Sequence, residues 1–140
     1  MMQPGILSGV RIMLVDDDGN QLTAFAHIYI LLGADVVTAP ESAPAIGLLR
    51  RRYAQGWVPH VAIIDWHMQQ PGADLARVLR DDSRFRDILR VSYSGAADIS
   101  ERAKTLENGL FHLLMEKGKR PYDQAQVMLD ELTRRKLIVP

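Results

Sequence analysis

The stretch Val61-Ala62-Ile63-Ile64-Asp65 is a short aliphatic run that stops at an acidic residue. The stretch Arg11-Ile12-Met13-Leu14-Val15 is built in the same way, and three aspartates follow it at positions 16–18. Short aliphatic runs of this kind are typical of strands that are buried on both faces of a parallel sheet. The two stretches therefore predict buried strands that are followed by carboxylates.

Segments with the helical spacing of apolar residues alternate with these and three further strand candidates. The predicted strands are residues 11–15, 35–39, 61–64, 88–93 and 110–115. The predicted helices are residues 21–32, 41–52, 99–106 and 121–137, together with one that begins over residues 74–80. Such alternation favours a parallel sheet with helices on both faces. We expect an α/β fold, the flavodoxin-like doubly wound five-stranded parallel sheet of strand order 2-1-3-4-5 with five helices.

The composition is that of a soluble globular protein. The chain has 140 residues, of which 47% are apolar and 24% charged. This length suits one domain, and we expect a single domain over residues 1–140 with its core at about residues 9–137. Lys plus Arg and Asp plus Glu both number 17, so the formal net charge is zero. Neutrality gives no support to bulk nucleic-acid binding or membrane attraction, and we expect neither partner.

The sequence contains no cysteine, which excludes disulfides, thiolate metal sites and cysteine nucleophiles. This absence is compatible with a reducing cytoplasm, which is the location we expect. The longest apolar stretches are too short to span a bilayer. Residues 6–15 are interrupted by Arg11 and end in acids, so they make a poor signal peptide.

Polar residues follow four of the five predicted strands. Asp16 and Asp17 follow the first strand, Asp65 the third, Ser94 the fourth and Lys117 the fifth. Ligands of an open α/β sheet bind beyond the carboxyl ends of its strands, so these side chains are expected to converge. Crowded carboxylates repel one another, and Mg²⁺, which prefers oxygen ligands, relieves that repulsion. An aspartate can also attack phosphorus, and phosphoryl transfer then needs positive charge and positioning.

Four short motifs carry a resemblance to a known family. They are Val15-Asp16-Asp17-Asp18, Ile63-Ile64-Asp65-Trp66-His67-Met68, Ser94-Gly95 and Glu116-Lys117. In this order, over nearly the whole chain, they resemble the four signatures of response-regulator receiver domains, the chemotaxis-regulator-like phosphoproteins of two-component systems. The resemblance implies phosphorelay signal transduction through an aspartyl phosphate, by a switch and not by a turnover enzyme.

The resemblance also implies a role for each matching residue. Asp65 would be the phosphoacceptor and, with Asp16, Asp17 and the backbone carbonyl of His67, would belong to the Mg²⁺ site. Asp17 would bind the metal directly and Asp16 largely through water. Ser94 would be the switch hydroxyl, and Lys117 would pair first with Asp65 and then with the phosphoryl group.

The partners follow from the same resemblance. The phosphodonor would be a sensor histidine kinase or a histidine phosphotransfer protein, and small donors such as acetyl phosphate often serve as well. The face formed by the fourth helix, the fifth strand and the fifth helix would bind a downstream protein or a second copy of the chain.

Three positions depart from the family pattern. Gln69 stands where proline usually follows Met68, Gly118 stands where proline usually follows Lys117, and Leu114 stands where an aromatic residue is usual. A cis bond before a non-proline residue costs roughly 3 kcal/mol, so we expect a trans Lys117–Gly118 peptide or a rearranged turn. Lys119 is the rival for the role of Lys117. These departures keep open a second hypothesis, a receiver-like interaction module that phosphorylation does not regulate.

His67 lies two positions after Asp65, where side chains in this family influence loss of the phosphoryl group. We hypothesise that His67 alters the lifetime of the phosphorylated state, against the alternative of a surface histidine without that role. A third hypothesis is a small phosphohydrolase of the haloacid-dehalogenase type. That class needs a second aspartate at this position, and the histidine there argues against it.

Overall fold

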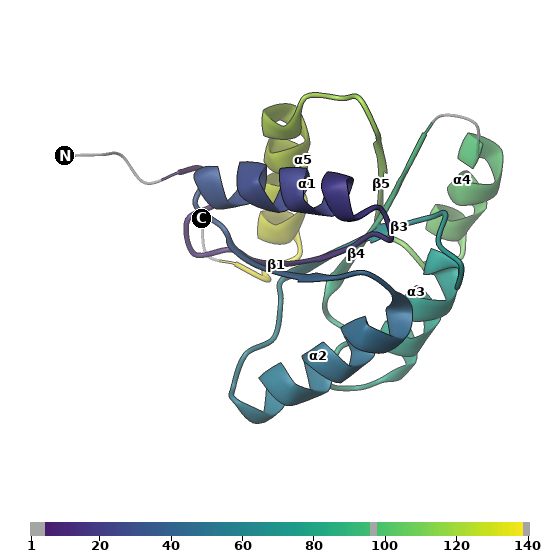
Figure 1. Cartoon of the computed structure of the whole chain (residues 1–140), viewed down its shortest axis with the longest axis horizontal. Helices are drawn as coiled ribbons and strands as arrows, with labels where there is room; N and C mark the ends of the chain where they lie inside the picture. Colours follow the sequence, from purple (N-terminus) through teal and green to yellow (C-terminus); the bar gives the residue numbers. More distant parts are fainter. Residues whose placement is uncertain (1–4, 96–97, 139–140) are drawn as a thin grey trace.

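A computed structural model of the chain describes residues 5–95 and 98–138. It contains one five-stranded parallel sheet of order β2-β1-β3-β4-β5, which confirms the predicted topology (Figure 1). The strands are β1 (Arg11–Val15), β2 (Asp35–Ala39), β3 (Val61–Asp65), β4 (Leu89–Ser94) and β5 (Leu113–Glu116). Four of them lie within a residue of their predicted bounds. The fifth starts three residues later than predicted, because Leu110 and Phe111 pack into the core from the preceding loop.

A helix follows each strand, as predicted. The helices are α1 (Gly19–Leu31), α2 (Ser42–Ala54), α3 (Gly72–Asp81), α4 (Ile99–Glu107) and α5 (Pro121–Arg134). α1 begins two residues earlier than expected because the side chain of Asp18 accepts the Gln21 N–H and caps the helix. α5 ends earlier than expected because Lys136 adopts a left-handed φ of 59°. The Leu137 N–H then bonds back to the Leu132 carbonyl, which closes the helix.

Two apolar layers bury the sheet. α1 and α5 cover one face, and α2 and α3 cover the other (Figure 1). Successive residues of a strand point to opposite faces, so Ile12 and Leu14 pack with the first layer and Met13 and Val15 with the second. Leu7, which precedes the predicted core, is fully buried against the first layer. Within the described part of the chain, no helix has both the length and the apolar character needed to cross a bilayer.

Candidate functional site

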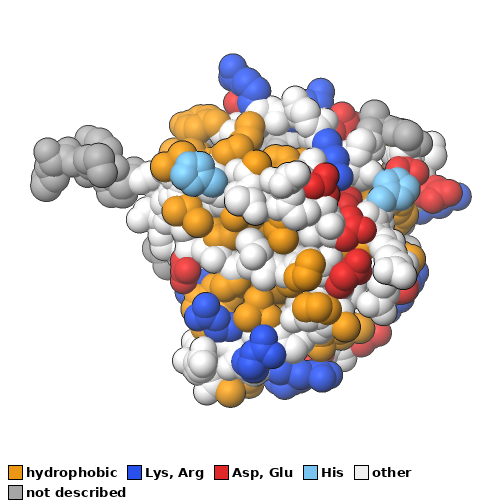
Figure 2. All heavy atoms as spheres, in the orientation of Figure 1, with side chains coloured by type: hydrophobic (Ala, Val, Ile, Leu, Met, Phe, Trp, Pro, Cys, Tyr) orange, Lys and Arg blue, Asp and Glu red, His pale blue; other side chains and the backbone are white. Residues whose placement is uncertain are grey.

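An acidic cluster lies where β1 and β3 end. These strands are neighbours, and Val15 pairs with Ile64, so the residues that follow them meet. Asp16, Asp17 and Asp65 each offer a carboxylate oxygen within 4.8 Å of the others. Acidic side chains gather at this end of the molecule, at the right of the view in Figure 2. The structure thus brings together the three carboxylates that the sequence predicted would converge.

The cluster is a place of unbalanced negative charge. Asp16 is 4% exposed and Asp65 2%, whereas Asp17 is open to solvent. Burial, with the nearby charge of Asp16, raises the pKa of Asp65 to about 6, while Lys117 and the backbone N–H of His67 oppose the rise. Oδ2 of Asp16 is buried and has no hydrogen-bond partner among the described residues. Hard oxygen donors, mutual repulsion and an unsatisfied carboxylate oxygen all fit a divalent cation such as Mg²⁺.

Lys117 supplies positive charge to the cluster. Its Nζ lies 3.5 Å from Oδ1 of Asp65 and 5.4 Å from the centre of the Tyr93 ring. Its backbone N–H donates to the Ser94 carbonyl at 2.9 Å, which ties the end of β5 to the end of β4. The rival Lys119 instead lies 4.0 Å from Glu116. The geometry therefore places Lys117, and not Lys119, beside Asp65.

The turn after Lys117 depends on glycine. Gly118 has a φ of +90°, which residues with a side chain rarely adopt. No peptide bond in the described residues is cis, as expected at this position without proline. Lys117 thus reaches Asp65 from a turn that differs from the expected family pattern.

A fourth carboxylate, Asp98, lies outside the acidic cluster and contacts two of the predicted site residues. The Ser94 hydroxyl is buried and donates to Oδ2 of Asp98 at 3.5 Å, and Nε2 of His67 pairs with the same oxygen. The backbone N–H of His67 donates to Oδ1 of Asp65 at 3.3 Å. Asp98 therefore joins the loop after β3 to the start of α4. The sequence carried no signal for this role, because an acid just before a helix is ordinarily a cap or solvated.

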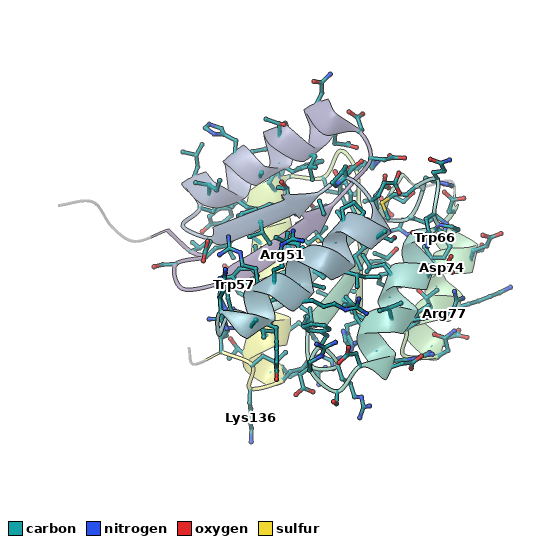
Figure 3. All side chains as sticks on the ribbon, turned by 60° about the horizontal axis from the view of Figure 1, so that its bottom comes forward. Arg51, Trp57, Trp66, Asp74, Arg77 and Lys136 are labelled. Atoms are coloured by element: carbon teal, nitrogen blue, oxygen red, sulfur yellow. The ribbon has the colours of Figure 1, made fainter. Side chains whose placement is uncertain are left out.

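The loop after β3 is held tightly against the end of that strand. A Cβ on Gly72 would lie 2.3 Å from the carbonyl oxygen of Asp65, so only glycine fits there. The Trp66 N–H donates to the Tyr93 carbonyl at 2.8 Å, and the Trp66 ring packs at a tilt on Phe111. Figure 3 labels Trp66 in this loop and Asp74 in the first turn of α3, the helix that follows it. The backbone around Asp65 is thus fixed from both sides.

An aromatic ring, that of Tyr93, lies beside the cluster, although Leu114 stands where the resemblance led us to expect an aromatic residue. Tyr93 immediately precedes Ser94, and its ring lies next to Lys117. The ring also packs edge-on against Phe25, with the two ring centres 5.0 Å apart. Alternation in β4 marks Tyr93 as a core residue, and nothing in the sequence indicates that its ring meets Lys117.

Comparison with models of protein families and with curated proteins found no match. Solved structures do match. A response regulator receiver domain protein from Clostridium thermocellum has a TM-score of 0.79 and 18% identity, covering 93% of this chain and 99% of that chain. A CheY-like receiver domain protein from Methanospirillum hungatei JF-1 has a TM-score of 0.74 and 19% identity, covering 91% and 96%. An adenylate cyclase from Rhodopirellula baltica has a TM-score of 0.77 and 17% identity, covering 91% and 90%.

Proposed function

We propose that this chain, which has the fold of response-regulator receiver domains, is a signalling switch that accepts a phosphoryl group on Asp65. One observation carries the proposal. The buried Asp65 carboxylate lies 3.5 Å from the Lys117 ammonium and within 4.8 Å of the Asp16 and Asp17 carboxylates. A nucleophilic carboxylate, further oxygen donors and a cation are the parts that phosphoryl transfer to an aspartate requires.

The transfer would use Asp65 as the nucleophile. A carboxylate oxygen of Asp65 forms a bond to phosphorus, and the bond from phosphorus to the donor breaks. The leaving group is the imidazole of a phosphohistidine or, with a small donor, acetate. Lys117 already lies beside Asp65 and remains to neutralise the phosphoryl oxygens. Asp16, Asp17, Asp65 and the backbone carbonyl of His67 would hold Mg²⁺, which when bound offsets the negative charge that builds up on the phosphoryl group.

The switch would begin at Ser94. Its hydroxyl now donates to Asp98 at a long 3.5 Å, so this contact is weak. A phosphoryl group on Asp65 offers ionised oxygens, which accept stronger hydrogen bonds. Ser94 would leave Asp98 for the phosphoryl group, and the start of α4 would respond because Asp98 immediately precedes that helix. Phosphorylation would thus bias the balance between two arrangements of the Ser94 side chain and the start of α4.

The proposal extends to partners and location. The phosphodonor would be a sensor histidine kinase or a histidine phosphotransfer protein. The face of α4, β5 and α5 would bind a downstream protein or a second copy of the chain. We propose a cytoplasmic regulator that stores one phosphoryl group and does not turn over a substrate.

The test is labelling of the purified chain with acetyl phosphate, followed by intact mass spectrometry. We expect one phosphoryl group on the wild type in the presence of Mg²⁺, none after addition of EDTA and none on Asp65→Asn. Asp18→Asn is the matched control, since Asp18 caps α1 and is not part of the acidic cluster. Beryllofluoride, a phosphoryl mimic, provides a second probe of Asp65. A wild type that accepts neither the phosphoryl group nor beryllofluoride would overturn the proposal and favour an interaction module that phosphorylation does not regulate.

A further inference from the structure

Arg102, in the middle of α4, is a buried cation that the proposed chemistry does not use. Its side chain is 0% exposed although it lies on a short surface helix. Nε donates to the Ser92 hydroxyl at 3.0 Å, and Nη2 donates to the carbonyls of Ser92 at 2.8 Å and Met115 at 2.7 Å. Nη1 donates to the Gly95 carbonyl at 3.4 Å. The guanidinium therefore joins α4 to the ends of both β4 and β5.

The atoms that Arg102 holds flank the two residues proposed to contact the phosphoryl group. Ser92 and Gly95 lie on either side of Ser94. Met115 lies two residues before Lys117. A backbone shift of Ser94 or Lys117 towards Asp65 would therefore act on neighbouring carbonyls that Arg102 binds directly.

The bonding of Arg102 makes this connection stiff. Each hydrogen bond that its guanidinium donates within the described residues goes to a neutral oxygen. A buried charge without a carboxylate partner depends on these bonds, because losing one leaves a donor unsatisfied. The guanidinium is planar and presents its donors at fixed angles, so it follows its acceptors as a unit. Burial lowers the pKa of the Arg102 guanidinium, while the charges of Glu116, Asp98 and Asp65 oppose that shift, and a phosphoryl group would add to their field.

We propose that Arg102 is the positioning residue that transmits phosphorylation of Asp65 to α4. The movement of Ser94 and Lys117 shifts the carbonyls of Gly95 and Met115, and Arg102 carries the shift to the helix. Position 114 is leucine, so no aromatic ring is present there to take part in the switch. The Arg102 guanidinium would instead couple the site to the proposed partner-binding face of α4, β5 and α5. This inference rests on the proposed function, since it needs a phosphoryl group on Asp65.

The test measures labelling and the response of α4 separately. Wild type and variants are treated with beryllofluoride and Mg²⁺, occupancy of Asp65 is measured by native mass spectrometry, and hydrogen exchange is followed in residues 99–107. In the wild type we expect exchange in α4 to change about five-fold or more, the lower end of ordinary coupling between sites. In Arg102→Met, at equal occupancy, we expect a change below about two-fold. Arg102→Lys should recover only part of the response, because it restores the charge and not the planar fork.

Arg90 provides the matched control. It is also buried in the sheet, 3% exposed, and donates to the carbonyls of Arg86, Gly109 and Leu110, but at the opposite end of β4. Arg90→Met should therefore lower stability as Arg102→Met does while leaving the response of α4 intact. If Arg102→Met does not fold, Ser92→Ala removes one acceptor and should weaken the response on its own.

The outcomes separate the inference from the proposed function. A wild type without beryllofluoride at Asp65 overturns the proposed function, and the inference with it. Normal occupancy with an unchanged response in Arg102→Met, or in Ser92→Ala where the former fails to fold, overturns the inference alone. The inference is also overturned if Arg90→Met and Arg102→Met lose the α4 response to the same extent, because Arg102 would then act only as a structural residue.

Discussion

The ammonium of Lys117 lies 3.5 Å from Oδ1 of Asp65, and 31% of the Lys117 side chain remains exposed. The pair joins β3 to the end of β5 across the intervening strand β4. Because Lys117 is only partly buried, it can shift with a phosphoryl group while staying near Asp65. This relationship supports the proposal that Lys117 is the partner of Asp65 before phosphorylation and would remain so after it.

Replacing this ammonium should slow labelling of Asp65. Lys117→Met should lower the rate of acetyl phosphate labelling by about 100-fold, the usual effect of removing one group that stabilises a developing charge. Intact mass spectrometry over time measures the rate. Lys119→Met, whose ammonium lies near Glu116, should label at the wild-type rate. If Lys119→Met is labelled more slowly than Lys117→Met, the role of neutralising the phosphoryl group belongs to Lys119.

His67 and Asp98 should influence the lifetime of the phosphoryl group together. The two side chains pair beside Asp65, and Asp98 also accepts from Ser94. His67→Ala and Asp98→Ala both break this pair, so we expect both to change the dephosphorylation rate in the same direction, by about five-fold, or roughly 1 kcal/mol. The measurement is loss of label after the donor is removed. Rates equal to the wild type would show that His67 has no such role.

Neutralising Asp65 should stabilise the fold in the absence of Mg²⁺. The raised pKa of Asp65, about 6, means that its ionised form costs free energy at pH 7. Asp65→Asn should therefore raise the free energy of unfolding by about 1–2 kcal/mol in EDTA. In the wild type, Mg²⁺ should add stability by binding the folded state, and the variant should lose much of this gain. Urea denaturation with and without Mg²⁺ tests both statements; a destabilised variant in EDTA would contradict them.

Gly72 and Gly47 should respond to alanine with opposite signs. A Cβ on Gly72 would collide with the Asp65 carbonyl, so Gly72→Ala should cost about 1–3 kcal/mol. Gly47 lies within α2, where a Cβ would meet only the far end of the Arg51 side chain at 3.4 Å. Gly47→Ala should therefore add about 0.5–1 kcal/mol. Urea denaturation measures both, and equal stability of the two variants would count against the close approach at Gly72.

His112 should make the fold sensitive to acid. Its Nδ1 accepts the Arg90 N–H at 2.8 Å, which requires a neutral ring, and burial with the nearby Arg90 charge lowers its pKa to about 4. Between pH 6.5 and 4, His112 therefore binds a proton more readily in the unfolded state than in the folded state, so the His112 contribution to stability falls as the pH falls through this window. After allowance for solvent screening, His112 should contribute on the order of 1–2 kcal/mol to this loss in the free energy of unfolding. His112→Asn keeps an acceptor without a titrating ring, so its stability should fall less than that of the wild type from pH 6.5 to 4. Parallel curves for the two proteins would contradict this prediction, because they would show that the pKa of His112 is the same in the folded and unfolded states.

Aliphatic runs and helical spacing were enough to predict the sheet. Residues 12–15 and 61–64 alternate between two packed layers. A strand with aliphatic residues on both faces is stable only where both faces are covered. The boundaries that were wrong depended on single contacts. Asp18 extends α1 backwards by capping it, and the left-handed Lys136 ends α5 early. Such contacts belong to the local geometry of a few atoms, which a pattern of apolar residues does not record.

The acidic cluster was also predictable, because parallel strands carry the residues that follow them to one edge of the sheet. Asp16, Asp17, Asp65 and Lys117 meet there for that reason. What surrounds them was decided only in three dimensions. Asp98 reaches His67 and Ser94 across two loops, and Arg102, which in sequence is one charge on a short polar helix, lies fully buried on the carbonyls of β4 and β5. Strand order determines which ends meet, but the direction in which a long polar side chain turns depends on which neutral oxygens the packed backbone leaves within its reach.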